Sequence, residues 1–504
     1  DQAVPKLEAV DGIDKAMTAL RTSYTIGPLP SFGAGVNVLG LDPASAADLV
    51  WFRKDFASQD LRSILARISS GTLPEHGVPL KGQPTSVSIW ANPIQPRVGT
   101  TLWVRTRDAN GVYRFLEMGT LDFTGYRKLE APINAQYNGV VYPISIVSIE
   151  MTQSENITDA ARDVVLDDLA MTDENGNEVV VDDFDGPSRW TVLPTATRNQ
   201  DVAKQVSTNT HGGNGALSFS FLTGTNAAIQ GVFANDPNIP LPAIASKQFV
   251  RATGVGPGGQ IDLVFGKVLV PITIQGVVDY FPTMYDNGAG FLLMNQQDLY
   301  YYAGMTSENA NLAPTEVWLT MSKDKDERKA AQTALLDKFG IPSGQIIDGQ
   351  QILNDIQTDP VVRAGGSGIL LVALVAAFAI LALGFALTLY LGGQSRTVEM
   401  AVMRAVGISP RQLFTMISLE YLLIAAVGLI VGTIAGLRIS RTMLGFLNVT
   451  SGGYRVVPPF ALVTQWDTVA IAFGAVGISF LIGVIALAGY FLRLQVSRVI
   501  RLTR

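Results

Sequence analysis

The chain has 504 residues, of which 48% are apolar and only 16% are charged. A charged fraction this far below the quarter typical of soluble domains indicates a membrane protein. The charge is unevenly divided, because residues 366–504 carry ten Arg, no Lys and three acids, and the preceding residues are acidic. This acidity excludes nucleic acid as a partner of the first part, since phosphate binding needs a basic surface. The absence of cysteine excludes disulfides and thiolate metal sites.

Residues 1–79 and 229–364 predict two pieces of one α/β domain. In the first piece, a strand over 35–41 precedes Asp42-Pro43, an N-cap with a first-turn proline, and helical spacing runs through 44–68. The second piece predicts strands at 261–265, 268–278, 291–294 and 317–321, and a charged helix over 325–339 that Gly340 ends. The chain begins with neither Met nor a signal peptide, so we expect that a preceding segment was removed or that this is part of a longer chain.

Residues 80–228 predict a β-sandwich inserted between these two pieces. Apolar residues alternate in period two, and Asn110-Gly111 between the segments 102–107 and 112–118 is a strong hairpin signal. The predicted sandwich is antiparallel and is similar to jelly-roll carbohydrate-binding modules around residues 164–169. Its tryptophans, which either pack in the core or stack on a sugar, are Trp90, Trp103 and Trp190.

No segment of the chain predicts catalysis. The acid-rich residues 159–185 either hold Ca²⁺ or form a solvated hairpin, and the spacing of their glycine favours the hairpin. His76 and His211 stand in no zinc or catalytic spacing and are expected in surface loops. The glycine-rich residues 254–259 lack the Lys-Ser/Thr of a phosphate loop. We therefore predict no enzyme activity, no catalytic residue, no metal and no cofactor, and expect that the chain does not bind or hydrolyse ATP by itself.

Three long apolar runs, at about 369–391, 413–437 and 468–492, predict an all-α module of three membrane spans within residues 365–504. Seven Arg flank the runs on the side of the loop 394–412 and of the C-terminus. The positive-inside rule then predicts a multi-pass protein of the cell membrane with a cytoplasmic C-terminus and with residues 1–365 outside the cytoplasm.

Gly428, Gly432 and Gly436 recur at every fourth position of the second predicted span. This spacing places them on one helix face, where another helix can approach the backbone closely. The glycines therefore predict a helix-packing surface, either within the subunit or across a dimer.

The loop between the first two predicted spans has the spacing of a short amphipathic helix over 397–407. Gly407 is expected to end this helix. Ser409 with Pro410 is expected to start the next one, as an N-cap followed by a first-turn proline. The alternative is a positively charged loop that only fixes the topology.

This loop and the glycine-rich span that follows resemble the FtsX-like permease family, the membrane subunits of MacB-type and LolCDE-type ABC systems. The resemblance covers about residues 365–504 and is carried by the pattern Arg-x-x-Glu-x-Ala-x-x-Arg-Ala-x-Gly over 396–407. It implies that 397–407 is a coupling helix that docks on an ATPase subunit. The docking residues that it implies are Arg396, Glu399, Met400, Arg404 and Gly407. The simplest members have four spans, one of them before the external domain, whereas three are visible here.

The same resemblance extends more weakly to the external part, which is similar to the periplasmic core of MacB-like permeases at residues 241–246 and 274–278. It implies a permease that pairs with an ABC-type ATPase and with a second FtsX-like module in a homo- or heterodimer within the lipid bilayer. The expected outcome is export of a lipid, lipoprotein or peptide, or mechanical signalling, with a possible glycan or lipid ligand outside. The alternative is a membrane-anchored glycan-binding or scaffold protein.

Overall fold

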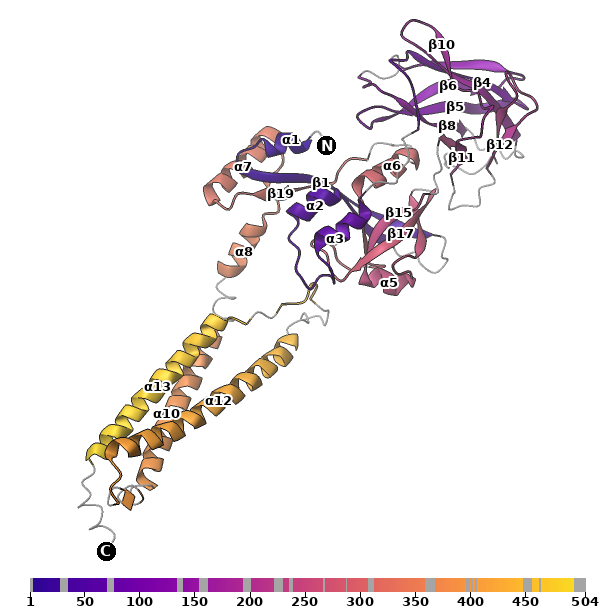
Figure 1. The fold of residues 1–504 in the computed structure, drawn as a ribbon. Helices are drawn as coiled ribbons and strands as arrows, with labels where there is room; N and C mark the ends of the chain where they lie inside the picture. Colours follow the sequence, from indigo (N-terminus) through magenta and orange to yellow (C-terminus); the bar gives the residue numbers. More distant parts are fainter. Residues whose placement is uncertain are drawn as a thin grey trace. The chain divides into compact units, whose positions relative to one another are not determined.

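The computed structural model describes residues 3–27, 35–69, 77–133, 139–153, 162–193, 201–221, 230–234, 239–265, 268–286, 288–306, 312–358, 368–395, 399, 402–403, 406–446, 456–461 and 464–493. Contacts divide the chain into two compact units, Asp1–Gly340 and Ile341–Arg504. The first unit is rich in β-strands and the second is helical (Figure 1). The predicted combination of a β-rich part containing an antiparallel sandwich with a C-terminal module of three apolar helices is confirmed.

A seven-stranded mixed sheet in the first unit combines strands from both ends of that unit. In spatial order its strands are β16 (Gln260–Phe265), β17 (Val268–Val278), β15 (Leu241–Ser246), β18 (Phe291–Asn295), β2 (Gly35–Leu41), β1 (Ile13–Gly27) and β19 (Glu316–Met321). The end of β1 also pairs with β16, with Ile26 opposite Leu263, so the sheet closes on itself. β15 is parallel to β17 and β18 is parallel to β2, whereas the other neighbours are antiparallel.

Short helices cover this sheet. They are α1 (Ala3–Glu8), α2 (Pro43–Leu49), α3 (Leu61–Leu65), η1 (Ala66–Ile68), α5 (Lys247–Thr253), α6 (Gln296–Thr306) and α7 (Lys325–Phe339). Asp42 caps α2 by accepting from the backbone N–H of Ser45, and Gly340 ends α7 in the left-handed conformation, as the sequence predicts. The helical spacing over 44–68 is interrupted, because Val50 turns to an extended conformation and Asp60 caps a separate helix, α3.

Two six-stranded antiparallel sheets form the sandwich. The first contains β12 (Val202–Val206), β13 (Ala216–Phe221), β9 (Arg162–Thr172), β4 (Ser86–Pro93) and β7 (Arg127–Pro132), with β10 (Glu178–Asp182) beside β9. The second contains β11 (Trp190–Val192), β14 (Gln230–Ala234), β8 (Ser145–Gln153), β5 (Arg97–Arg107) and β6 (Tyr113–Leu121), with β3 (Val78–Pro79) beside β8. These strands extend a few residues beyond the predicted 80–228 at both ends.

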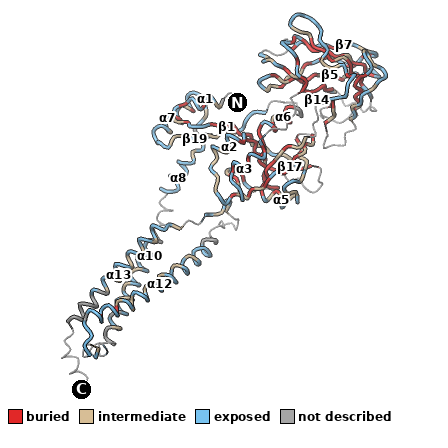
Figure 2. Tube along the Cα trace, in the orientation of Figure 1, coloured by how far each residue is buried: buried red, intermediate tan, exposed pale blue. Residues whose placement is uncertain are grey.

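The two sheets of the sandwich enclose one hydrophobic core. Alternate residues of their strands point inward, among them Ile89, Val104 and Phe219, and Trp190 is also buried there. Trp90 and Trp103 are only half-buried. Figure 2 shows buried residues concentrated in the strands of the first unit, whereas the long helices of the second unit are largely exposed.

The second unit contains α8 (Gly349–Thr358), α10 (Ile369–Ser395), α12 (Pro410–Phe446) and α13 (Trp466–Arg493). The last three helices are long and apolar enough to cross a membrane over Leu371–Gly392, Arg411–Met443 and Trp466–Gly483. Large apolar side chains on them are exposed to an extent that a soluble fold does not tolerate, such as Leu383 at 73% and Ile471 at 74%. A lipid environment removes this difficulty, so the three helices are those of a membrane protein.

Candidate functional site

The predicted helix stop at Gly407 is present. Gly407 has a φ of +101°, which favours glycine, and the residues on either side make the hydrogen bonds of a helix C-terminus. The N–H of Val406 donates to the carbonyl of Val402 at 3.1 Å, and the N–H of Ile408 donates to that of Met403 at 3.2 Å. The second bond is the one that closes a Schellman motif.

A capping box follows at once and starts α12. The backbone N–H of Gln412 donates to Ser409 Oγ at 3.3 Å, and the N–H of Ser409 donates to Gln412 Oε1 at 3.0 Å. These reciprocal bonds satisfy two of the donors that a helix start leaves open, and Pro410 supplies the first helical position. The predicted start of the second apolar helix at Ser409-Pro410 is therefore confirmed.

A small hydrophobic cluster joins this junction to the helices. Leu413 and Ile417, on the first turns of α12, are buried, and Met403, Tyr421 and Phe385 of α10 pack against them. The end of the preceding helix and the start of α12 are thus connected by packing as well as by two residues of chain. We call the described residues of this arrangement, Met403 and 406–417, the elbow.

Of the predicted docking residues, the structure describes only two. Glu399 is helical and exposed, and Gly407 ends the helix as described above. Arg396, Met400 and Arg404 lie outside the described residues. Docking on an ATPase stays a prediction for all five.

The predicted packing glycines line a cavity of about 1060 Å³ between α10, α12 and α13. In the described part of the chain, no atom lies within 4 Å of where a Cβ would stand on Gly428, Gly432 or Gly436. No helix of the described chain therefore uses the close approach that these residues permit. Helix packing at this face stays a prediction.

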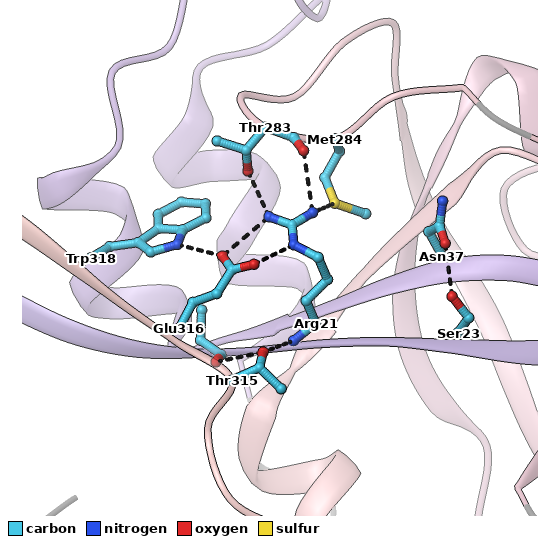
Figure 3. Close-up of polar contacts among 9 residues, drawn as sticks. Arg21, Ser23, Asn37, Thr283, Met284, Thr315, Glu316 and Trp318 are labelled. Atoms are coloured by element: carbon cyan, nitrogen blue, oxygen red, sulfur yellow. Dashed lines mark hydrogen bonds and ion pairs between the residues drawn. The ribbon is translucent and has the colours of Figure 1, made fainter. Parts of the chain in front are cut away.

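Sequence reasoning missed a polar network in the first unit that is centred on Arg21 of β1 (Figure 3). The guanidinium forms an ion pair with Glu316 of β19 and donates to Thr283 Oγ1 at 2.9 Å and to the Thr283 carbonyl at 3.2 Å. The hydrogen bonds from Arg21 are the main reason that the pKa of Glu316 lies below its usual value. The network ties the edge strand β19 to β1 and to the turn before β18, so its role is structural.

A buried arginine, which is paired within the sandwich, connects the sandwich to α6. Arg105 of β5 is fully buried, and its Nε lies 2.7 Å from Glu150 Oε1 of β8. The guanidinium also lies 4.4 Å from the ring centre of Phe115 and donates to the carbonyl of Gly304, at the end of α6. Tyr113 packs into the space that the missing side chain of Gly304 leaves. The contact holds the insertion firmly on α6.

The outer face of the sandwich carries an aromatic cluster around Trp90. The ring of His211 stacks on Trp90 with centroids 3.7 Å apart, and Tyr126 lies 5.3 Å from the same imidazole. His211 is exposed, as the sequence predicts, and its Nδ1 lies 2.8 Å from Asp168 Oδ2. His76 lies outside the described residues. The acid-rich segment forms strands and turns, and no group of three metal-ligating side chains is found among the described residues.

Residues 371–496 match the family described as FtsX-like permease C-terminal, and this stretch contains all three apolar helices. The resemblance of this region to that family is therefore confirmed. Domains of the family are membrane subunits of ABC transporters. None of the curated proteins matches the chain.

Proposed function

We propose, from the premise that residues 371–496 are an FtsX-like permease C-terminal domain, that the chain is the permease subunit of an ABC-type complex. A partner ATPase would bind and hydrolyse ATP in the cytoplasm. This chain would convert the closure of the ATPase into movement of its first unit outside the cytoplasm. The complex would pair the chain with a second FtsX-like module. Its outcome would be export of a lipid, lipoprotein or peptide, or a mechanical signal.

The topology that this function needs agrees with the distribution of charge. Arg411 stands at the start of α12 and Arg493 at the end of α13, so both mark the same side of the bilayer. Together with the arginines beyond them they outnumber those of the opposite flank, which favours a cytoplasmic location for the elbow and the C-terminus. The first unit, which precedes α10, would then lie outside the cytoplasm.

The observation that supports the coupling role best is the construction of the elbow. A helix that ends at Gly407 is followed within two residues by a capped helix, and Met403 packs on Leu413 and Ile417. A push on a surface connected in this way would move α12 as a rigid body, because the connection has only two residues and is packed against the helix. A loop that only fixes topology needs none of these features.

The test is charge reversal at Glu399, which is exposed beside the elbow. We expect Glu399→Lys to leave the protein in the membrane but to weaken association with the ATPase by at least about tenfold, or ~1.4 kcal/mol. The matched control is Asp467→Lys, since Asp467 is an exposed acid at the opposite end of a span. Equal association of the two variants in co-purification would remove the docking proposal.

A second function, glycan binding by the sandwich, is favoured by the Trp90 cluster. Aromatic rings with carboxylates beside them can stack on a sugar and bind its hydroxyls, although His211 already covers one face of Trp90. On this account Tyr126→Ala abolishes retention of the full chain on a glycan array and leaves its thermal stability almost unchanged. Retention that does not depend on Tyr126, or none at all, would exclude this cluster as a sugar site.

A further inference from the structure

The cavity between the three apolar helices is elongated. Its α12 wall runs along one helix face from Ala425 to Arg441, a length of roughly 24 Å at the rise of an α-helix. Phe385 of α10 and Phe480 of α13 line it together, with ring centres 5.7 Å apart. Arg441 and Trp466 lie at the end opposite Ala425.

The lining has two chemically different parts. Along most of its length the walls are apolar, with contributions such as Leu381, Leu429 and Phe473, and the glycine face of α12 widens it. Polar side chains, those of Ser440, Arg441 and Thr464, gather toward Trp466, and Arg441 alone is charged among the described residues of the lining. A tryptophan at the start of a span and an arginine at the end of the neighbouring one mark the level of the lipid headgroups.

We propose that this cavity binds one anionic phospholipid of the surrounding bilayer. An acyl chain would lie along Gly428, Gly432 and Gly436 with its end at the two phenylalanines. The phosphate would lie at Arg441, which is a suitable donor for phosphate oxygens. The face of about 24 Å is longer than one leaflet, which is about 15 Å of hydrocarbon, so an extended chain fits.

The charge of the lining favours a lipid over a second copy of α12 as the occupant. Arg441 is complementary to an anionic headgroup, whereas a second copy of α12 would bring its own Arg441 to the same place. The site goes beyond the ATPase-coupling role and does not require it. The proposed topology places Arg441, and with it the phosphate, in the outer leaflet, and only this assignment rests on that topology.

The test uses the full chain with its co-purifying partners in lipid nanodiscs. The probe is phosphatidylglycerol with a photoreactive group at the end of one acyl chain. The comparison is phosphatidylcholine with the same photoreactive acyl chain. We expect cross-links to peptides of the cavity wall and about a fivefold preference for phosphatidylglycerol, the size expected for one arginine at a charged membrane surface.

Two pairs of variants make the result decisive. Gly432→Leu fills the cavity and should abolish capture. Gly477→Leu is its control, because Gly477 has equally open surroundings on α13 but does not line the cavity. Arg441→Gln should remove the preference for the anionic lipid, whereas Arg438→Gln, one turn away and outside the lining, should keep it. The arginine pair decides the matter if Gly432→Leu does not fold.

Capture that is equal in Gly432→Leu and Gly477→Leu, or cross-links between the α12 helices of two copies through the cavity, would overturn the lipid site. The ATPase content of each preparation is measured in parallel. Lipid capture of the expected pattern without an ATPase would refute the proposed function and leave the lipid site intact. A bound ATPase without lipid capture would refute the lipid site and leave the proposed function intact.

Discussion

Asp298 and Arg105 are ionisable side chains buried in the first unit. The surroundings of Arg105 stabilise its charge, whereas those of Asp298 disfavour a charge. Arg105 has a carboxylate, a carbonyl and an aromatic face around it. Asp298, in the first turn of α6, is 1% exposed, and its Oδ1 has no hydrogen-bond partner among the described residues. A buried charge is stable only where neighbouring groups compensate it, so substitution of Asp298 and substitution of Arg105 should have opposite effects on stability.

Burial raises the pKa of Asp298 to about 7, although the start of a helix favours a carboxylate. The folded chain therefore binds an extra proton between about pH 4 and 7, so the stability from neutral Asp298 is complete below about pH 4 and is lost as pH rises through about 7. As the pH rises from about 4 to 7, the free energy of unfolding of Asp298→Asn should therefore increase relative to that of the wild type by up to about 4 kcal/mol. Thermal unfolding of both proteins between about pH 4 and 7 checks this prediction. Unfolding midpoints that change with pH in parallel in the two proteins would contradict it.

Arg105→Met should leave Glu150 buried and uncompensated, with a loss of about 3–5 kcal/mol. For a chain of 504 residues that unfolds as one unit, the midpoint of thermal unfolding would fall by roughly 3–5 °C. The double variant with Glu150→Leu should recover most of the loss, because it removes the unpaired charge. Lys15→Ala is the control, since the Lys15 pair with Asp48 is exposed and its loss should leave the unfolding midpoint almost unchanged. A double variant no more stable than Arg105→Met would contradict this account.

At the scale of the elements, the elbow depends on one backbone conformation. Gly407 has a positive φ, and a Cβ added to it would meet no atom of the described residues but would strain the backbone by roughly 1–2 kcal/mol. This separates the effect of the helix stop from any loss of packing.

Gly407→Ala should loosen the elbow and lower ATP hydrolysis in the assembled complex by about tenfold if the full strain enters the coupling step. Gly477→Ala is the matched control, because the same change in an open helix interior should stabilise α13 by roughly 0.5–1 kcal/mol. Hydrolysis measured in nanodiscs would separate them. Equal rates in the two variants would show that the helix stop is not needed for coupling.

Most elements with a regular pattern could be predicted from the sequence. The strand over 268–278 and the helix over 325–339 have the bounds that alternation and capping indicate. β1 was missed, because its fifteen residues pair with three different strands and its pattern of burial is irregular. The break after Val50 was also missed, since apolar residues continue through it at helical spacing.

In the candidate sites, too, local features could be predicted from the sequence and long-range contacts could not. Gly407 and Ser409 could be identified because a helix stop and a capping box are local signals. The contact between Arg105 and Gly304 could not, because the two residues lie 199 positions apart. The cavity depends on where three helices stand, which a glycine spacing alone does not specify.

At the scale of the molecule, a β-rich unit and a module of three membrane helices are joined in one chain, and the FtsX-like permease match covers only the second. The elbow belongs to that module, and the proposed coupling role requires a partner that supplies the force from ATP.

The most direct measurement is purification of the full chain from its native membranes in mild detergent, followed by mass spectrometry of the proteins present in stoichiometric amounts. The account predicts a P-loop ATPase among them, bound in wild type and lost in Glu399→Lys. An intact complex that contains other partners but no ATPase would contradict it.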